Sequence, residues 1–196
     1  MKKIIIGISG ASGAIYGIRL LEATQQSTEV ETHLVMTEAG ALTIQQETNW
    51  RLSAVLELAD QVHDINDIGA SIASGSSHMD GMVIAPCSIK SMSMIANSIN
   101  YNLLIRAADV TLKERRKLIL MVRETPLHLG HLKLMVSATE NGAIIQPPVP
   151  AFYNQPRTLD DIVNHAVGRI LDHFDINHTL YEGWKGIRQS KDKPVN

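Results

Sequence analysis

A basic and an acidic side chain, Arg123 and Glu124, follow directly after a predicted buried strand. The segment 117–130 reads KLILMVRETPLHLG, and its apolar run is typical of a strand covered on both faces of a parallel sheet. Ligands bind at the carboxyl ends of such strands, where unused charges would cost solvation free energy. The pair is therefore a candidate for chemistry, and the alternative is an ion pair that only solubilises the strand end.

Residues 7–13, GISGASG, lie between a predicted strand and a predicted helix. Backbone amides at a helix N-terminus favour an anion, and small residues let a phosphate approach closely. Ser9 and Ser12 add hydroxyl donors. The spacing matches neither the dinucleotide fingerprint nor the P-loop, which ends in Gly-Lys-Ser/Thr. We interpret the Ser9–Gly13 turn as a phosphate site, and the alternative is a tight turn that needs glycine for its geometry alone.

Residues 86–91, PCSIKS, repeat this geometry after another predicted strand. Ser88 suits the N-cap position of the next helix, and the serines with Lys90 could hold a second anionic or polar part of a ligand. A plain capped helix explains the segment equally well. Cys87 is not expected to be a nucleophile, because no base is evident nearby.

Several other candidates are single side chains in unusual positions. Glu47 ends a predicted helix, where a carboxylate opposes the helix dipole. Arg169 borders the apolar stripe of the last helix, so we expect it to be partly buried and either to snorkel outward or to face an anion. Tyr153 follows the stiff segment 147–150, PPVP, and Trp184 lies near the C-terminus. Core or interface packing is the simpler explanation for both rings.

One predicted helix carries a charged face. Arg106, Asp109 and Lys113 recur at i, i+3 and i+7, and therefore lie on the same side of the helix. Such a face is usually solvated and ion-paired, and the basic residues from Lys113 to Arg116 also suit a helix C-terminus. The pattern alone does not assign a function to these residues.

These candidates depend on alternating strands and helices. Apolar runs predict strands over 4–8, 30–36, 81–85, 117–122 and 143–146, with Pro86 ending the third. Helices are predicted from about Ser12, after the N-cap Thr37, over 88–98, 103–114 and 128–140, and behind a capping box at 158–161. Residues 48–72 are expected to be helical in parts. This alternation predicts an α/β protein with a parallel, doubly wound sheet.

Composition excludes several classes of function. The chain has 196 residues and a formal net charge of −2, which does not favour nucleic-acid binding. No apolar segment has the length of a membrane span or of a signal peptide's apolar region. The single cysteine excludes an internal disulfide and fits a reducing cytoplasm. No His/Cys spacing resembles a zinc site, so no metal is expected.

Together the motifs resemble the flavin prenyltransferases, the UbiX-like family. The resemblance runs from residue 1 to about 185 and rests on segments 7–17, 45–49, 74–77, 86–91, 106–126 and 147–156. It implies a three-layer, Rossmann-like and flavodoxin-like subunit, with residues 1–188 as one domain and 189–196 as a polar tail. It also implies a cytoplasmic homododecamer that joins the dimethylallyl group of dimethylallyl monophosphate to N5 and C6 of reduced FMN without a metal. The prenylated FMN would then serve a UbiD-type decarboxylase.

The resemblance also assigns roles to residues. It implies catalytic roles for Glu124, Glu47, Lys113 and Ser12. It implies FMN contacts by Gly10, Ala11, Ser12, Thr37, Ser88, Ile89, Lys90, Ser91, Arg106 and Arg123. It implies that the substrate is bound by Lys113, Tyr153 and Arg169, which hold the prenyl phosphate, and by Trp184, which helps to enclose that pocket. Ile68 stands where some members carry a tryptophan, so no cation-stabilising aromatic is expected at that point.

Two rival functions remain open at the level of the sequence. A flavin-dependent decarboxylase of peptidyl or pantothenoyl cysteine would share the fold and FMN, but its Asn-rich motif and catalytic His are not found here. A non-catalytic flavin-binding subunit would need only the glycine turns. The combination of Glu47, Lys113, Glu124, Tyr153 and Arg169 argues against that second function. The sequence does not distinguish a monophosphate from a diphosphate donor, or ubiquinone synthesis from aromatic acid breakdown.

Overall fold

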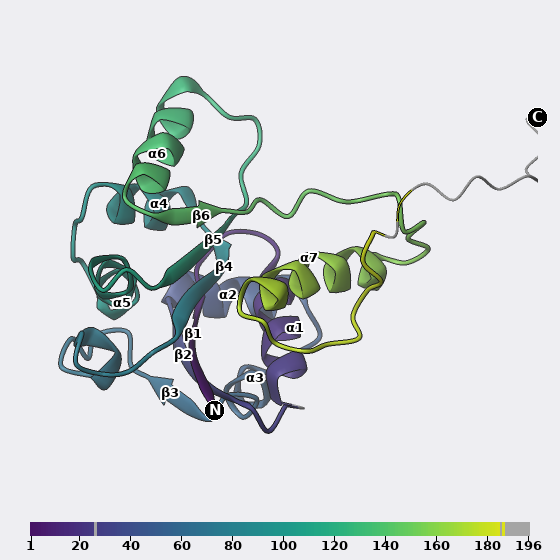
Figure 1. Ribbon diagram of the computed structural model, residues 1–196. Coiled ribbons are helices and arrows are strands. Elements are labelled where there is room, and N and C mark those ends of the chain that lie inside the picture. The colour runs from purple at the N-terminus through teal and green to yellow at the C-terminus, as the bar shows by residue number, and fades with distance from the viewer. Residues whose placement is uncertain (26, 185, 187–196) are drawn as a thin grey trace, which may run out of the picture.

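The computed structural model contains a six-stranded, all-parallel sheet in the order β3-β2-β1-β4-β5-β6 (Figure 1). It describes residues 1–25, 27–184 and 186, so the predicted polar tail 189–196 lies outside the described residues. The strands are β1 Lys2–Ile8, β2 Val30–Met36, β3 Gln61–His63, β4 Gly81–Cys87, β5 Lys117–Val122 and β6 Ala143–Ile145.

Helices cover both faces of this sheet, which confirms the predicted three-layer α/β fold. They are α1 Ala14–Gln25, α2 Glu38–Glu47, α3 Leu52–Leu56, α4 Ile89–Ala96, α5 Leu103–Lys113, α6 Leu129–Glu140 and α7 Leu159–His173, with a 3-10 turn at Ser71–Ala73. Figure 1 shows α1 and α7 on one face, with α4 and α5 on the other. The Thr158–Asp161 capping box at the start of α7 is present as predicted.

The apolar runs in the sequence form two cores, one on each face. Along β1, Ile4, Ile6 and Ile8 pack on the α1 and α7 face, while Ile5 packs on the opposite face with residues of α4 and α5. All seven residues of β4 are buried, because helices cover this central strand on both sides. A strand of this kind has no polar face, which explains why its sequence does not alternate.

Three details differ from the sequence-based expectations. The strand predicted to end before Pro86 continues to Cys87, because the β4–β5 register shifts between Ile84 and Cys87, and an irregular register tolerates a proline. The short edge strand β3 was not predicted within 48–72, where α3 does supply the expected helix. Helix α1 begins at Ala14 and not at Ser12, since Gly13 adopts φ +100°.

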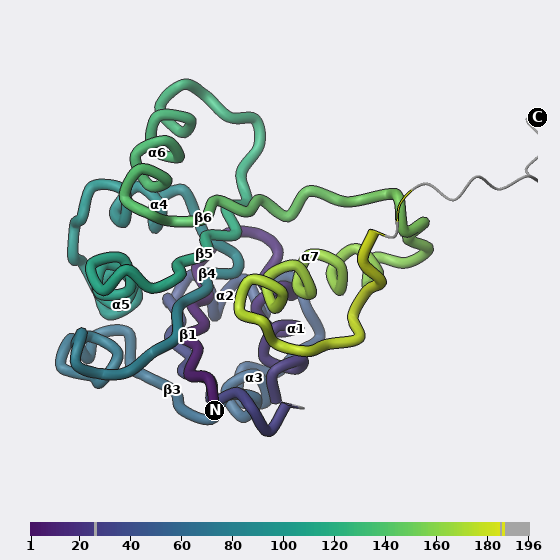
Figure 2. The backbone as a smooth tube through the Cα atoms, in the orientation of Figure 1, coloured from purple at the N-terminus to yellow at the C-terminus, as the bar shows by residue number. Residues whose placement is uncertain are grey.

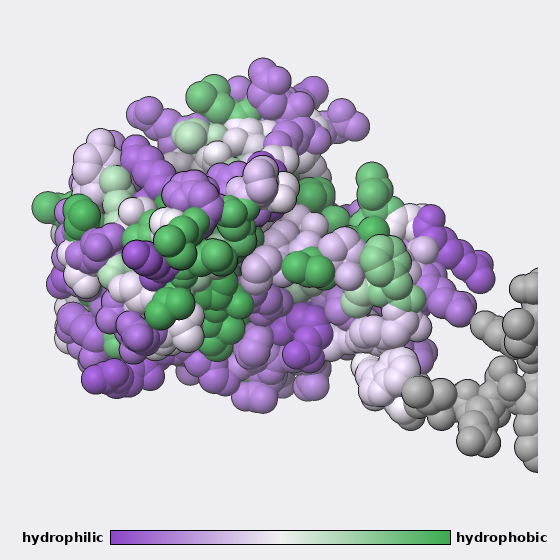
Figure 3. Space-filling view, turned by 90° about the horizontal axis from the view of Figure 1, so that it is seen from above, coloured by the Kyte–Doolittle hydropathy of each residue, from purple (hydrophilic) through white to green (hydrophobic). Residues whose placement is uncertain are grey.

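The chain leaves the sheet after β6 and returns to it as α7. Figure 2 shows residues 146–158 and residues 174–184 both extending away from the sheet beside this helix. Apolar side chains also gather on the surface seen in Figure 3. On α6 and the loop before it, the exposed apolar residues are Leu127, Leu129, Leu132 and Val136.

Gly17 of α1 gives a test of how closely the helix layer approaches the sheet. A Cβ at this position would lie 2.4 Å from the Ala85 carbonyl oxygen and 2.8 Å from Ile8 Cγ1. Overpacking of this kind costs about 1–3 kcal/mol, against a gain of up to about 1 kcal/mol in helix propensity. We therefore expect Gly17→Ala to lower the urea unfolding midpoint. Gly183→Ala is the control, because a Cβ there meets nothing within 4 Å; equal midpoints for the two variants would contradict the close approach.

Candidate active site

Four turns bring predicted site residues to one edge of the sheet. Ser12 follows β1, Thr37 follows β2, Ser88 follows β4 and Arg123 follows β5. Because these strands are parallel and adjacent, their carboxyl ends meet at the same edge. The predicted position of the site at this edge is therefore consistent with the topology.

A cavity of about 570 Å³ opens between the N-termini of α2 and α4. Thr37 caps α2 by accepting from the Gly40 amide at 3.0 Å, and Ser88 caps α4 by accepting from the Ser91 amide at 3.2 Å. Lys90 adds a positive charge beside these two helix ends. The residues that line the cavity are Ser9, Gly10, Thr37, Glu38, Ala39, Ile65, Asn66, Ser88, Lys90, Ser91, Met94, Tyr101, Asn102 and Ile105. Hydroxyls, an ammonium group and two helix N-termini suit the phosphate and the polar chain of a nucleotide-like ligand.

The glycine turn forms one wall of this cavity. Buried Ser9 connects two turns, because its Oγ donates to the Pro86 carbonyl at 2.9 Å and accepts from the Ser88 amide at 2.8 Å. A Cβ at Gly10 would lie 2.3 Å from Ala39 Cβ, so only glycine lets this turn approach α2 so closely. Of the two neighbours predicted to contact FMN, Ala11 is buried within the turn. Ile89, the first residue of α4, packs against the core.

Glu47 ends α2 and reaches the N-terminus of α1. Its Oε2 accepts from the Gly13 amide at 2.7 Å, and it also interacts with the Ser12 hydroxyl and the Ala14 amide. Arg123 Nε donates to the Ser12 carbonyl at 3.2 Å. The predicted residues Ser12, Glu47 and Arg123 are therefore brought together in one subunit.

The position of Glu47 changes the interpretation of the glycine turn. Since the Gly13 amide donates to this carboxylate, it is not free to bind a phosphate. The expected phosphate site over the whole Ser9–Gly13 turn therefore does not include the Gly13 amide. Partial burial raises the pKa of the Glu47 carboxyl, but the hydrogen bonds from Gly13, Ser12 and Ala14 outweigh this, so its pKa lies below the ordinary value.

Glu124 is exposed and does not pair with its neighbour. Its Oε1 accepts from the Thr125 amide at 3.1 Å, while Arg123 turns toward Ser12. None of the ion pairs in the described part of the chain includes Glu124. The alternative of a simple Arg123–Glu124 ion pair at the strand end is therefore not observed. Burial raises the pKa of the Cys87 thiol to about 12, which agrees with the expectation that it is not a nucleophile.

Arg106 and Lys113 lie on α5, beside the small-residue loop 74–77. Arg106 pairs with Asp109 at 2.9 Å and donates to the Ala73 carbonyl at 3.3 Å. Lys113 pairs with Glu114, and a Cβ at Gly75 would lie 2.7 Å from its Nζ. Helix α5 ends where β5 begins, whereas Glu124 follows the other end of β5. Six strand residues span about 20 Å, so one subunit does not combine Lys113 and Glu124 at one substrate as predicted.

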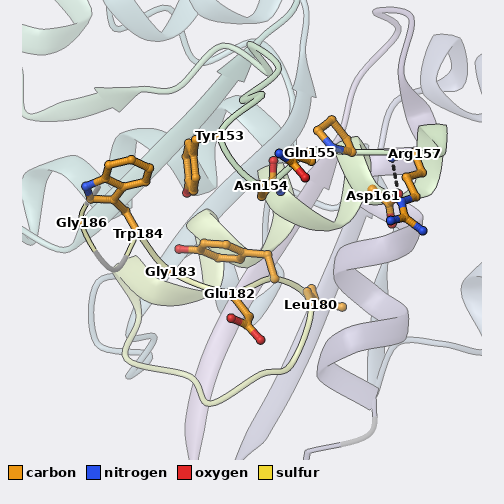
Figure 4. Close-up of a pocket in the computed structure, with 12 residues that line it drawn as sticks. Tyr153, Asn154, Gln155, Arg157, Asp161, Leu180, Glu182, Gly183, Trp184 and Gly186 are labelled. Atoms are coloured by element: carbon orange, nitrogen blue, oxygen red, sulfur yellow. Dashed lines mark hydrogen bonds between the residues drawn. The ribbon is translucent and has the colours of Figure 1, made fainter. Parts of the chain in front are cut away.

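Tyr153, Arg169 and Trp184 form a third group, beside a cavity of about 770 Å³. Tyr153 and Trp184 meet edge to face at 5.3 Å, and Figure 4 shows them side by side, with Arg157 and Asp161 further along the cavity. The Arg169 side chain is 51% exposed and pairs with Asp172 at 3.2 Å, which agrees with the expected partial burial. The long side chain extends outward from its position beside the apolar stripe, as in the snorkelling alternative.

Comparisons with known proteins agree with this geometry. The family model described as Flavoprotein matches residues 1–170. The flavin prenyltransferase UbiX of Thauera aromatica is 62% identical over 184 residues, covering 94% of each chain. The chain belongs to the UbiX family of flavin prenyltransferases.

Two solved structures of UbiX relatives superpose closely on this fold. The first is AnUbiX (PadA1) in complex with FMN and dimethylallyl pyrophosphate, with a TM-score of 0.93 and 45% identity, covering 95% of this chain and 99% of that chain. The second is a dodecameric FMN-dependent UbiX-like decarboxylase from Escherichia coli O157:H7, with a TM-score of 0.92 and 46% identity, covering 94% and 100%.

Some features of this UbiX family member were not predicted. His165, Asp172 and Tyr181 interact with Tyr153 and Arg169. Helical spacing places His165 and Asp172 near Arg169 on α7, but nothing in the sequence indicates that Tyr181 folds back onto this helix. The described residues contain no group of three or more His, Cys, Asp or Glu side chains that could hold a metal ion. The helices described include none with the length and apolarity of a membrane span.

Glu47→Gln tests whether the carboxylate stabilises the start of α1. Because the pKa of Glu47 lies below 4.5 in the folded protein, its contribution is fully present above pH 4.5 and is lost as the pH falls through the folded-state pKa. We expect the variant to lose about 0.5–1 kcal/mol at pH 7, a small amount because water screens this exposed group. The difference from wild type should shrink below pH 4.5. Urea unfolding at pH 7 and at a pH below 4.5 measures this difference in stability, with Glu57→Gln as an exposed control. A loss of stability that does not depend on pH would contradict this role of Glu47.

Proposed function

We propose that this protein transfers the dimethylallyl group of dimethylallyl monophosphate to N5 and C6 of reduced FMN, releasing phosphate and forming prenylated FMN. The observation that carries the proposal is the 45% identical relative, which binds FMN and dimethylallyl pyrophosphate on the same fold. Two further observations support it: Ser12, Glu47 and Arg123 lie together at the carboxyl edge of the sheet, and the cavity at the N-termini of α2 and α4 opens at the same edge.

The residues present fit FMN. The hydroxyls of Thr37, Ser88 and Ser91, the Lys90 ammonium and the N-termini of α2 and α4 can hold its phosphate in the 570 Å³ cavity. Gly10 leaves room at the wall of this cavity, where a side chain would clash with α2. When bound and reduced, FMN supplies the electron-rich N5 and C6 that accept the prenyl group. Ser12, Glu47 and Arg123 border this edge and would contact the flavin ring.

The side chains have two kinds of role: some stabilise the leaving phosphate and others transfer protons. Lys113 and Arg169 supply positive charge, and Tyr153 a hydroxyl donor, to the phosphate that departs from the allylic carbon. Glu124 protonates the departing oxygen or relays a proton during ring closure. Glu47 is ionised at neutral pH and accepts from the Ser12 hydroxyl, so this pair can accept a proton from the flavin edge. Cationic side chains thereby take the place of a metal ion.

These roles of Lys113 and Glu124 require more than one subunit. Lys113 and Glu124 lie at opposite ends of β5, so a complete site needs their contributions from different chains. We propose a homododecamer, as reported for the relative from E. coli O157:H7, with exposed apolar residues such as Leu129 and Val136 available for the contacts. Within it, residues 1–188 act as one domain in the cytoplasm, and the prenylated FMN passes to a UbiD-type decarboxylase.

Decarboxylation is the second candidate function, because the E. coli relative is described as a UbiX-like decarboxylase. One experiment separates the two activities. Purified protein is incubated anaerobically with reduced FMN and dimethylallyl monophosphate, and the flavin is weighed by mass spectrometry. A flavin heavier by one C5 prenyl unit supports transfer. An unchanged flavin, together with carbon dioxide released from an aromatic acid by the isolated protein, would support decarboxylation.

Glu124→Gln tests the acid–base role. The amide keeps the size and hydrogen bonding of the side chain but cannot transfer a proton, so prenylation should slow by about a hundredfold or more while FMN binding persists. Rapid mixing of the variant with reduced FMN and dimethylallyl monophosphate measures the rate. Wild-type turnover would refute the role, and a parallel loss of stability and FMN affinity would indicate a structural one.

Ser88→Asp tests the position of the FMN phosphate. Aspartate also caps helices, so α4 should remain intact while the added charge repels the phosphate. We expect the dissociation constant for FMN to rise at least about tenfold, with little change for riboflavin, which has no phosphate. Ser12→Asp is the matched control, because its charge faces Glu47 and should not discriminate between the two flavins. Fluorescence titration decides; a larger FMN-specific loss in Ser12→Asp would place the phosphate at the α1 turn.

A further inference from the structure

A chain of contacts connects Tyr153 to Arg169, the two side chains assigned to the prenyl phosphate. Tyr153 Oη lies 2.9 Å from His165 Nε2, and the His165 ring meets the Tyr181 ring edge to face at 4.6 Å. Tyr181 Oη donates to Asp172 Oδ2 at 2.5 Å, and Arg169 pairs with the same carboxylate oxygen at 3.2 Å. Tyr153 and Arg169 are thus connected through three other side chains, His165, Tyr181 and Asp172.

His165 differs from its neighbours in burial. It is 9% exposed on the inner side of α7, whereas Tyr153 is 45% exposed. Burial, and then the positive charge of Arg169, lower the pKa of His165 below its ordinary value, although Asp172 opposes them. The ring is therefore neutral at pH 7 and carries its proton on only one nitrogen. Its Nε2 can either accept from the phenol or donate to it.

The substrate distinguishes these two possibilities. Phosphate oxygens accept hydrogen bonds, so Tyr153 contributes to binding only if its O–H points toward the substrate. Its oxygen is then free to accept from a donor on the protein side, and His165 Nε2 is the atom at that distance. In the opposite arrangement Tyr153 donates to His165, and its lone pairs repel the phosphate.

We propose that His165 is a positioning residue of the prenyl-phosphate site, whose Nε2–H donates to Tyr153 Oη and so directs the phenol proton toward the substrate phosphate. This inference rests on the proposed function, because it takes Tyr153 as a ligand of that phosphate. It gives a buried imidazole on α7 a role that packing alone does not require.

The surrounding residues hold His165 in this position. A Cβ at Gly168 would lie 2.5 Å from Tyr181 Cδ1, so glycine at this position lets the Tyr181 ring pack onto α7 and cover His165. Asp172 fixes Tyr181 through its hydroxyl and also accepts from His178 at 3.0 Å. Tyr181, which lies in the described segment after α7, thereby packs against the imidazole.

Two substitutions of similar size separate donation from packing. His165→Gln keeps an N–H donor near the Nε2 position, whereas His165→Leu fills the space without a donor. Binding of dimethylallyl monophosphate is measured by calorimetry on protein loaded with oxidised FMN, so that no turnover occurs. We expect the dissociation constant to rise about tenfold or more in His165→Leu, the effect of losing one hydrogen bond to a charged group. His165→Gln should stay within about threefold of wild type.

A double-mutant cycle with Tyr153→Phe tests the route of the effect. If His165 acts through the phenol, His165→Leu should add no further loss once the hydroxyl is absent. Equal loss in the Tyr153→Phe background, wild-type binding by His165→Leu, or a His165→Gln variant as weak as His165→Leu would each overturn the proposal. So would a loss that follows unfolding temperature and FMN affinity in step, since that indicates a structural role.

Inorganic phosphate serves as a second probe that is independent of prenyl transfer. We expect wild type and His165→Gln to bind inorganic phosphate more tightly than His165→Leu does. Direct binding of phosphate, or its competition with dimethylallyl monophosphate, measures this affinity. If the three proteins show this order of affinities but the wild type never adds a C5 unit to FMN, the proposed function is refuted and the role of His165 stands. A protein that prenylates FMN but shows no such order would refute the role of His165 alone.

Discussion

The site depends on the buried hydroxyl of Ser9. By donating to Pro86 and accepting from Ser88, it holds the turn after β1 and the turn after β4 at one distance from each other. Loss of this hydroxyl would leave the Ser88 amide without its acceptor, at a cost of about 1–3 kcal/mol, whereas the Pro86 carbonyl would keep its hydrogen bond from the Ser9 amide at 3.2 Å. The cavity at the N-termini of α2 and α4 therefore has a fixed wall before any ligand enters it.

Glu47 connects the C-terminus of α2 to the N-terminus of α1 and stabilises both helix ends. At the C-terminus of α2 its negative charge is poorly placed, but its side chain reaches the N-terminus of α1, where amides of Gly13 and Ala14 need an acceptor. The same contact brings a carboxylate against Ser12 and near Arg123. A structural requirement of the strand-to-helix turn and a requirement of the chemistry are thus met by one side chain.

The parts of the molecule that were predictable from sequence are those determined locally. The buried runs of β1, β4 and β5, the N-caps Thr37 and Ser88 and the Thr158–Asp161 capping box all depend on neighbours in the chain, and each was found as expected. The edge strand β3 was missed, because it has only three residues, Val62 between the polar Gln61 and His63, and so short a segment carries no clear period. The folding back of Tyr181 onto Gly168 depends on tertiary contacts, which periodicity does not contain.

The separation of Lys113 and Glu124 could not be seen in the sequence either, although only ten residues lie between them. A helix end, a turn and the whole of β5 occupy that interval, and a strand carries the chain straight across the molecule. In the proposed oligomer, each subunit would thus contribute to two different sites, one at either end of this strand. A mixed assembly of chains altered at one end with chains altered at the other would then contain some sites built entirely from intact ends. The activity of such an assembly would depend on how many of its sites are intact and not on how many of its subunits are. Two inactive alleles expressed in one cell would then complement each other.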